Sequence, residues 1–216
     1  AALAGYQRGW ATVKVDWALR TPIPWRDATV AGAGTVHLAD SVDELAVQAA
    51  AISGSHVHDD AFVILGQMTT ADSTRSPPGT ESAWAYTHVP FRVRDGGAAR
   101  AITDAEVARV VDRIEDRVEG HAPGFRDRIV ARHVLSPAEL ERRDANLVEG
   151  DNAGGTNQLH QQLVFRPLPG LGRPTTPIRG LYLASASAHP GGGVHGACGA
   201  NAARAALAAH RVRRVV

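Results

Sequence analysis

The sequence has little sulfur and no excess of charge. Cys198 is the sole cysteine and Met68 the sole methionine of the 216 residues. One cysteine excludes an internal disulfide and a zinc site built from several thiolates, and it favours a reducing, cytoplasmic setting. The 23 basic and 22 acidic residues nearly cancel, which argues against a nucleic-acid partner. No apolar run approaches the roughly 18 residues of a membrane-spanning helix, and we expect no transmembrane segment.

A second absence concerns dinucleotide binding. No G-x-G-x-x-G motif follows a strand near the start of the chain, so the pyrophosphate turn of a Rossmann fold is missing. The first residue is Ala rather than Met. We therefore expect the chain to begin partway through a longer reading frame.

The remaining pattern predicts an α+β fold. Residues 11–19 alternate Val13, Val15 and Trp17 with polar residues, as a half-buried strand does. Capping boxes at Ser41 with Glu44 and at Thr103 with Glu106 predict two helices. Further strands are expected over 35–38, 61–67, 83–89 and 129–135, followed by a helix that starts at Ser136 and Pro137. These elements predict a mixed, largely antiparallel sheet with flanking helices. We place a domain boundary after Leu147, between residues 1–147 and 148–216.

The most informative segment is Gly180 to Asn201. Leu181 to Ala184 is a short apolar run typical of a buried strand, and residues 191–193 are three consecutive glycines. Residues 197–210 are rich in alanine and predict a helix. Glycines expose main-chain N–H groups, and the positive end of the helix dipole faces the same turn. The segment therefore predicts a cradle for a flat or anionic ligand.

Other patterns suggest different chemistry. His56, His58 and Asp60 match most of the H-x-H-x-D-H metal signature, but Ala61 stands where its last ligand belongs, and a polar turn before the strand 61–67 is the preferred interpretation. Cys198 and His195, three residues apart, could act as a nucleophile and its base. Alternatively, Cys198 is a small side chain that packs near the start of the helix. Ser185 and Ser187 lack the flanking glycines of a hydrolase elbow. Residues 151–155 could form a calcium-binding or phosphate-binding loop, but they lack the carboxylates of an EF-hand and the lysine of a Walker motif, and a plain loop is the alternative. We assign no metal site.

The last third of the chain resembles a known family. The segments 150–155, 158–162, Phe165 to Gly170 and Gly180 to Ala203 are similar to the C-terminal signature of phytoene desaturase-like FAD-dependent oxidoreductases, in the amine-oxidase-type flavoprotein group. The segments 13–19, 22–25, 66–72 and 84–90 resemble that family's substrate domain. The resemblance implies a substrate-binding domain over residues 1–147. It also implies the closing strand and helix of a Rossmann-like FAD domain over residues 148–216.

The resemblance implies that the cradle holds the isoalloxazine end of FAD. Ala184 and Ser185 would approach the ribityl chain. His189 would shape the turn. His195 would donate to the flavin or face the substrate as a catalytic residue, or merely be hydrogen-bonded in the turn. The residues so implicated in cofactor binding are Ala184, Ser185, His189, Gly191, Gly192, Gly193, Val194, His195 and Gly196.

The implied reaction is hydride transfer from an organic, apolar substrate to flavin N5. Since the N-terminal Rossmann portion that would hold the ADP half is absent, we expect this chain alone to retain FAD weakly or not at all. The partners implied are this missing portion and a small-molecule substrate, and we expect apolar surface that is exposed or buried in a homo-oligomer. Five aromatic residues either line an apolar substrate cavity or belong to the core: Tyr6, Trp10, Trp17, Trp25 and Trp84. The alternative function is a non-catalytic binding module on a flavoprotein-like scaffold.

Overall fold

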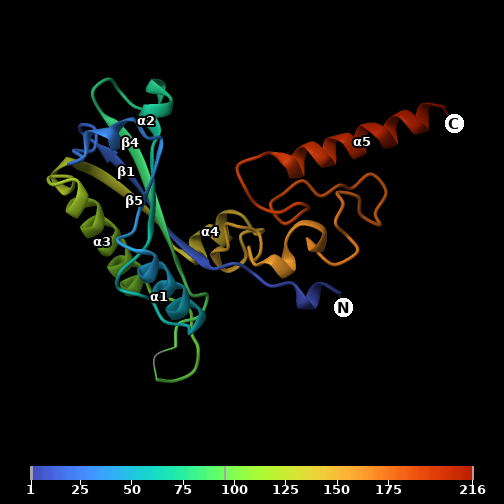
Figure 1. Ribbon diagram of the computed structural model, residues 1–216, viewed down its shortest axis with the longest axis horizontal. Helices are drawn as coiled ribbons and strands as arrows, with labels where there is room; N and C mark the ends of the chain where they lie inside the picture. Colours follow the sequence, from blue (N-terminus) through green and yellow to red (C-terminus); the bar gives the residue numbers. More distant parts are fainter. Residues whose placement is uncertain (1, 95, 216) are drawn as a thin grey trace. The chain divides into compact units, whose positions relative to one another are not determined.

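The computed structural model describes residues 2–94 and 96–215, which divide into two compact units. The sheet unit comprises Trp10–Ala145 (Figure 1). The glycine-rich unit joins residues 2–9 to residues 146–215. Ala1, where the predicted first domain begins, lies outside the described residues. The assignment of residues 1–147 to substrate binding and of 148–216 to cofactor binding stays a prediction.

The sheet unit is built on five antiparallel strands. Their order in the sheet is β2-β3-β4-β1-β5, and every neighbouring pair runs antiparallel. The predicted α+β architecture with a largely antiparallel sheet is therefore confirmed. The strands are β1 (Ala11–Leu19), β2 (Thr35–Leu38), β3 (Val63–Gln67), β4 (Glu81–Val89) and β5 (Ile129–Leu135). The helices of this unit are α1 (Val42–Ser53), α2 (Met68–Ala71), α3 (Asp104–His121) and α4 (Pro137–Arg143).

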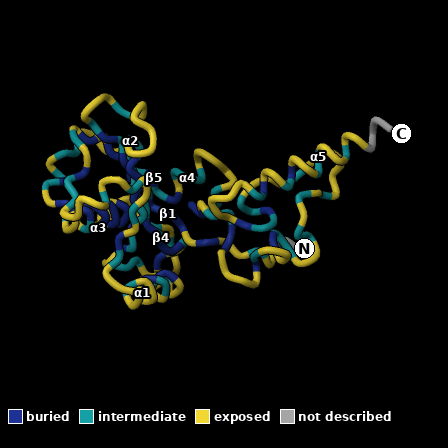
Figure 2. Tube along the Cα trace, turned by 45° about the horizontal axis from the view of Figure 1, so that its top comes forward, coloured by how far each residue is buried: buried dark blue, intermediate teal, exposed yellow. Residues whose placement is uncertain are grey.

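One face of the sheet carries the hydrophobic core. Val13, Val15 and Trp17 of β1 are buried, as their alternation predicts, and they share the core with residues of α3, which packs on the sheet (Figure 1). The Trp17 indole donates to buried Glu115 of α3 at 3.1 Å. Thr103 and Glu106 form the predicted capping box at the start of α3, and the Arg100 guanidinium lowers the pKa of Glu106 to about 2. Figure 2 shows the buried residues concentrated on the strands of this unit.

The opposite face of the sheet carries a row of aromatic rings. Trp84 and Tyr86 are nearly parallel at 5.9 Å between centroids, and Tyr86 meets His88 edge-on at 5.6 Å. Burial raises the pKa of Tyr86. The Trp84 indole lies over Gly66, its partner across β3 and β4, so that a Cβ on Gly66 would meet the ring at 2.2 Å. A glycine is therefore required at this position of β3.

The glycine-rich unit ends in the predicted alanine-rich helix, α5 (Ala197–Val215). The strand expected over Leu181 to Ala184 does not form: Tyr182 makes an isolated bridge to Thr175, and the Leu181 and Leu183 side chains are 48% and 36% exposed. A strand buried on both faces requires hydrogen-bonding neighbours on both edges, and the described residues supply one short partner. Within the described part of the chain, no helix combines the length and apolar character needed to cross a membrane.

We predict opposite effects for two glycine-to-alanine substitutions in the sheet unit. Gly66→Ala drives a methyl group into the Trp84 ring and should lower the free energy of unfolding by about 1–3 kcal/mol. Gly120→Ala, near the end of α3 and with open space around its Cβ, should raise it by up to about 1 kcal/mol. Urea unfolding of the two variants and the wild type measures both. Equal stabilities for Gly66→Ala and the wild type would contradict the packing of Trp84 on Gly66.

Candidate functional site

The glycine turn and the first residues of α5 form one wall of a cavity. The cavity has a volume of about 160 Å³. Its lining comes from the residues before the glycine turn, from the turn itself and from the start of α5. These residues are Ala184, Ala186, Gly191, Gly192, Gly193, His195, Gly196, Ala197, Cys198 and Gly199. Most of the residues predicted to bind a cofactor therefore lie together around one cavity. Because glycine and alanine predominate, the wall consists largely of main chain.

Two of the three consecutive glycines are required by the local packing. Gly191 has φ +121°, and a Cβ there would lie 2.0 Å from Oε1 of Gln162. Gly193 has φ +157°, and its Cβ would lie 2.8 Å from the His195 ring. Between them, Gly192 has an ordinary φ, and its nearest neighbour would be 3.5 Å from an added Cβ. The outer glycines thus shape the turn, whereas Gly192 leaves space at the cavity wall.

His195 is hydrogen-bonded within the turn. Its Nδ1 accepts a hydrogen bond from the Ala197 N–H, at 3.0 Å, at the first residue of α5. In the neutral ring, Nδ1 is then the acceptor and Nε2 carries the proton. The edge of the ring with Nε2 packs against Gly193. His195 therefore has one nitrogen engaged by the helix and one N–H to donate, and its catalytic role stays a prediction.

Cys198 connects the start of α5 to the turn. Its side chain is buried, and Sγ lies within hydrogen-bonding distance of the carbonyl oxygens of Ala188, at 3.4 Å, and Gly191, at 3.2 Å, which share its single S–H donor. His195 uses its Nδ1 to bind Ala197 rather than the thiol. This arrangement agrees with a packing role and gives no geometric support to a nucleophile and base pair.

The other predicted residues lie beside the cavity rather than in its lining. Ser185 Oγ accepts from the Ser187 N–H at 3.2 Å, and the His189 Nδ1 bonds to the Leu163 carbonyl at 2.8 Å. Val194 is fully exposed at the tip of the turn. Ser185 and His189 thus stabilise the shape of the segment, and the side chain of Val194 is free to contact a ligand.

Arg166 is a residue of this unit that the sequence reasoning did not select. Its side chain is completely buried and donates to carbonyl oxygens of the loop 153–161 and of Ala186, which lines the cavity. The sequence did contain one indication of its importance. Between Asp151 and Arg173, Arg166 is the only residue among Lys, Arg, Asp and Glu.

The cavity wall has hydrogen-bond donors for an electron-rich ring edge. Within residues 2–94 and 96–215, the N–H groups of Cys198 and Gly199 have no hydrogen-bond partner, as is usual in the first turn of a helix. These donors and the dipole of α5 favour negative charge at the cavity. The wall therefore favours an electron-rich ligand edge, and the binding of a flavin there stays a prediction.

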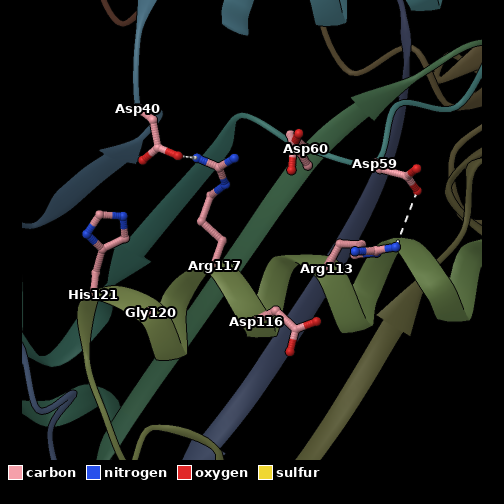
Figure 3. A pocket seen from close by; sticks show the side chains of 9 residues that line it. Asp40, Asp59, Asp60, Arg113, Asp116, Arg117, Gly120 and His121 are labelled. Atoms are coloured by element: carbon pink, nitrogen blue, oxygen red, sulfur yellow. Dashed lines mark hydrogen bonds and ion pairs between the residues drawn. The ribbon is translucent and has the colours of Figure 1, made fainter.

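A second cavity, of about 400 Å³, lies in the sheet unit beside α3 (Figure 3). Several of its charged side chains form ion pairs, two of them between residues of the lining. Arg117 lies 3.6 Å from Asp40 and Arg113 lies 3.5 Å from Asp59, while Asp116 pairs with Arg126 at 2.8 Å. The lining carries four carboxylates against the two guanidiniums of Arg113 and Arg117, so its net charge is negative and disfavours an anionic ligand.

The alternative metal site at His56 and His58 finds no support in the geometry. His58 Nδ1 accepts from the backbone N–H of Asp60 at 3.0 Å, which is the bond of a polar turn. No group of three His, Cys, Asp or Glu side chains suited to a metal occurs among the described residues.

The aromatic residues proposed for a substrate cavity have different surroundings. Trp17 is 2% exposed and belongs to the core, where its ring meets Phe125 edge-on at 5.1 Å. Trp10 is 39% exposed and packs on His88, in the aromatic row that contains Trp84. Trp25 donates to Gln67 Oε1 at 2.8 Å. Trp17 is therefore excluded from a substrate cavity.

Two kinds of curated relatives resemble the chain. Pyridine nucleotide-disulfide oxidoreductase domain-containing protein 2 of Mus musculus is 36% identical over 136 residues, which are 62% of this chain and 23% of the mouse protein. A lycopene-forming phytoene desaturase of Pseudescherichia vulneris is 31% identical over 157 residues, which are 72% of this chain and 30% of the bacterial protein. The chain thus spans less than a third of the length of these relatives. They confirm the resemblance that the sequence motifs indicate.

The structural similarity is weaker. An oxidoreductase from Methanosarcina mazei matches with a TM-score of 0.42 and 13% identity, over 95% of this chain and 35% of that one. This likeness is too low to support an argument. No protein-family model matches the chain.

The buried position of Cys198 generates a prediction about its reactivity. In the folded chain, the thiol should react with a disulfide reagent at least about tenfold more slowly than in urea, because the turn must open first. The control is Val194→Cys in a Cys198→Ala background, which places a thiol at a fully exposed position of the same turn and should react rapidly in the folded state. Equal rates for the two thiols would contradict the described packing.

Proposed function

We propose that this chain, a relative of the phytoene desaturase-like oxidoreductases, supplies one wall of a flavin site at the cavity formed by the glycine turn and the start of α5. The observation that carries the proposal is the convergence of Ala184, the three glycines 191–193 and His195 on one cavity. A wall of main chain lets a planar ring approach closely, which larger side chains would prevent.

The electrostatics of the wall support a flavin rather than an apolar ligand. A flavin gains negative charge at its pyrimidine edge when it is reduced. The unpartnered N–H groups of Cys198 and Gly199 and the positive end of α5 would stabilise that charge without a cationic side chain. His195 would add one donor, because its proton resides on Nε2 in the neutral ring.

The proposed reaction is the oxidation of an organic, apolar substrate. A bound flavin supplies the oxidant, since its N5 accepts a hydride from a substrate C–H bond. The residues of this chain would orient the ring edge. His195 would donate a hydrogen bond from its Nε2–H to the ring, or face the substrate.

The proposed cofactor is FAD, of which this chain would bind the flavin end. A cavity of about 160 Å³ is smaller than the roughly 300–1,000 Å³ of pockets that enclose a ligand of this size. The ADP half has no dinucleotide motif to bind it in this sequence. We therefore propose weak binding by the isolated chain. The lone cysteine remains the basis for proposing a cytoplasmic location.

Amide NMR of the 216-residue chain tests the proposed site. Millimolar riboflavin 5′-phosphate should shift the backbone signals of residues 184–199, because its isoalloxazine ring lies against that main chain. ADP at the same concentration should leave these signals unchanged. Shifts confined to other residues, or no shifts at all with the flavin, would refute the proposal.

A pair of glycine variants makes the test specific. Gly192→Val adds a side chain at the cavity wall without forcing an unfavourable φ, and it should weaken the flavin-induced shifts at least about tenfold in apparent affinity. Gly34→Val adds the same side chain in open space of the sheet unit and should leave them unchanged. The same affinity in both variants would mean that the flavin binds elsewhere.

A further inference from the structure

Arg166 is a buried cation that donates its hydrogen bonds to neutral backbone carbonyls. Its side chain has 0% exposure, and it is among the largest fully buried side chains in the described chain. A buried guanidinium destabilises a protein unless its N–H groups are all satisfied. The hydrogen-bond acceptors of Arg166 must therefore be held in fixed positions.

The five N–H groups of the guanidinium match five backbone carbonyls. Nε donates to Ala186 at 2.7 Å. Nη1 donates to Thr156 at 2.9 Å and to Gln161 at 3.3 Å. Nη2 donates to Ala153 at 3.1 Å and to Gly154 at 2.9 Å. Since arginine has five such donors, the donor set is fully used.

These carbonyls belong to two segments that are distant in sequence. Four come from the loop 153–161, and the fifth, Ala186, lies in the wall of the cavity. The Gly154 carbonyl also accepts from Ser187 Oγ at 2.8 Å. An added Cβ on Gly191 would lie 3.2 Å from Cδ of Arg166, so the arginine stem packs directly behind the glycine turn.

Asp151 orders the other side of the same loop. It is fully buried, and its carboxylate accepts from the N–H groups of Gly9 at 2.8 Å and Ala153 at 2.9 Å. The loop is thus held at the Ala153 N–H by a carboxylate, which also binds the N–H of Gly9, and at four of its carbonyls by a guanidinium. Both interactions are charge-assisted and stronger than neutral hydrogen bonds.

We propose that Arg166 is a positioning residue that holds the wall of the flavin cavity against the loop 153–161. This inference rests on the proposed flavin site. Arg166 acts through Ala186 and Gly191 and does not line the cavity itself. Lysine would keep the charge but supply three donors from a single atom, so it cannot satisfy carbonyls in two segments as a planar fork does.

The first experiment needs no flavin. Arg166→Lys and Arg166→Met are compared with the wild type by the rate at which Cys198 reacts with a disulfide reagent. Cys198 reports on the turn because it bonds to Ala188 and Gly191. We expect the rate to rise at least about tenfold in Arg166→Met, and to rise clearly in Arg166→Lys, because local opening becomes easier. Wild-type rates in both variants would overturn the proposal. A wild-type rate in Arg166→Lys alone would also overturn the proposal, because a positive charge without the planar set of donors would then be enough to hold the turn.

The second experiment distinguishes positioning from general stability. The control Glu115→Gln removes the charge of a buried carboxylate that bonds to Arg126 and Arg132 in the sheet unit. It should lower the unfolding midpoint while leaving the Cys198 rate and the flavin-induced shifts of residues 184–199 unchanged. Both Arg166 variants should weaken those shifts. If Glu115→Gln changes the Cys198 rate and the shifts as much as Arg166→Met does, the positioning role is refuted.

The two proposals fail differently. A wild type without flavin-induced shifts contradicts the flavin site, and the Cys198 rates then decide by themselves whether Arg166 holds the turn. Normal flavin shifts in Arg166→Met would overturn the positioning role while leaving the flavin site intact.

Discussion

The glycine-rich unit depends on the hydrogen bonds that the Arg166 guanidinium donates to five carbonyls. Few apolar side chains are buried in the described residues of this unit; the principal ones are Ala188, Cys198 and Ala202. Hydrogen bonds to a charged group contribute about 1.5–3 kcal/mol each, and a carbonyl that loses such a donor while buried is costly. The loop, the turn and the start of α5 therefore take their shape mainly from polar contacts rather than from a hydrophobic core.

The sheet unit is stabilised by the opposite kind of interaction. Its core is one apolar cluster, with α3 packed on one face of the sheet. The other face presents the aromatic row, which a glycine in β3 accommodates. The chain thus combines a packed sheet with a cavity whose wall consists largely of main chain, because its lining residues are mostly glycine and alanine. This combination agrees with the relation to flavin-type oxidoreductases at the level of the family.

Local patterns predicted the local elements. The period of two in β1, the capping box of α3 and the alanine-rich sequence of α5 each depend on residues within a few positions, and all three elements form as expected. The prediction of a strand at Leu181 was wrong. A strand needs hydrogen-bonding neighbours, and no local sequence pattern specifies whether they are present. The residues of the cavity could be predicted because they are contiguous in sequence. Arg166 could not, since its acceptors are backbone carbonyls, which carry no sequence identity.

The most direct test of the central claim is photoaffinity labelling with an azido-substituted flavin, followed by mass spectrometry of the digested chain. The account predicts that the label attaches within residues 184–199 and that excess riboflavin 5′-phosphate prevents the attachment, whereas ADP does not. Labelling distributed over the sheet unit, or labelling that excess flavin does not reduce, would contradict a flavin site at the glycine turn.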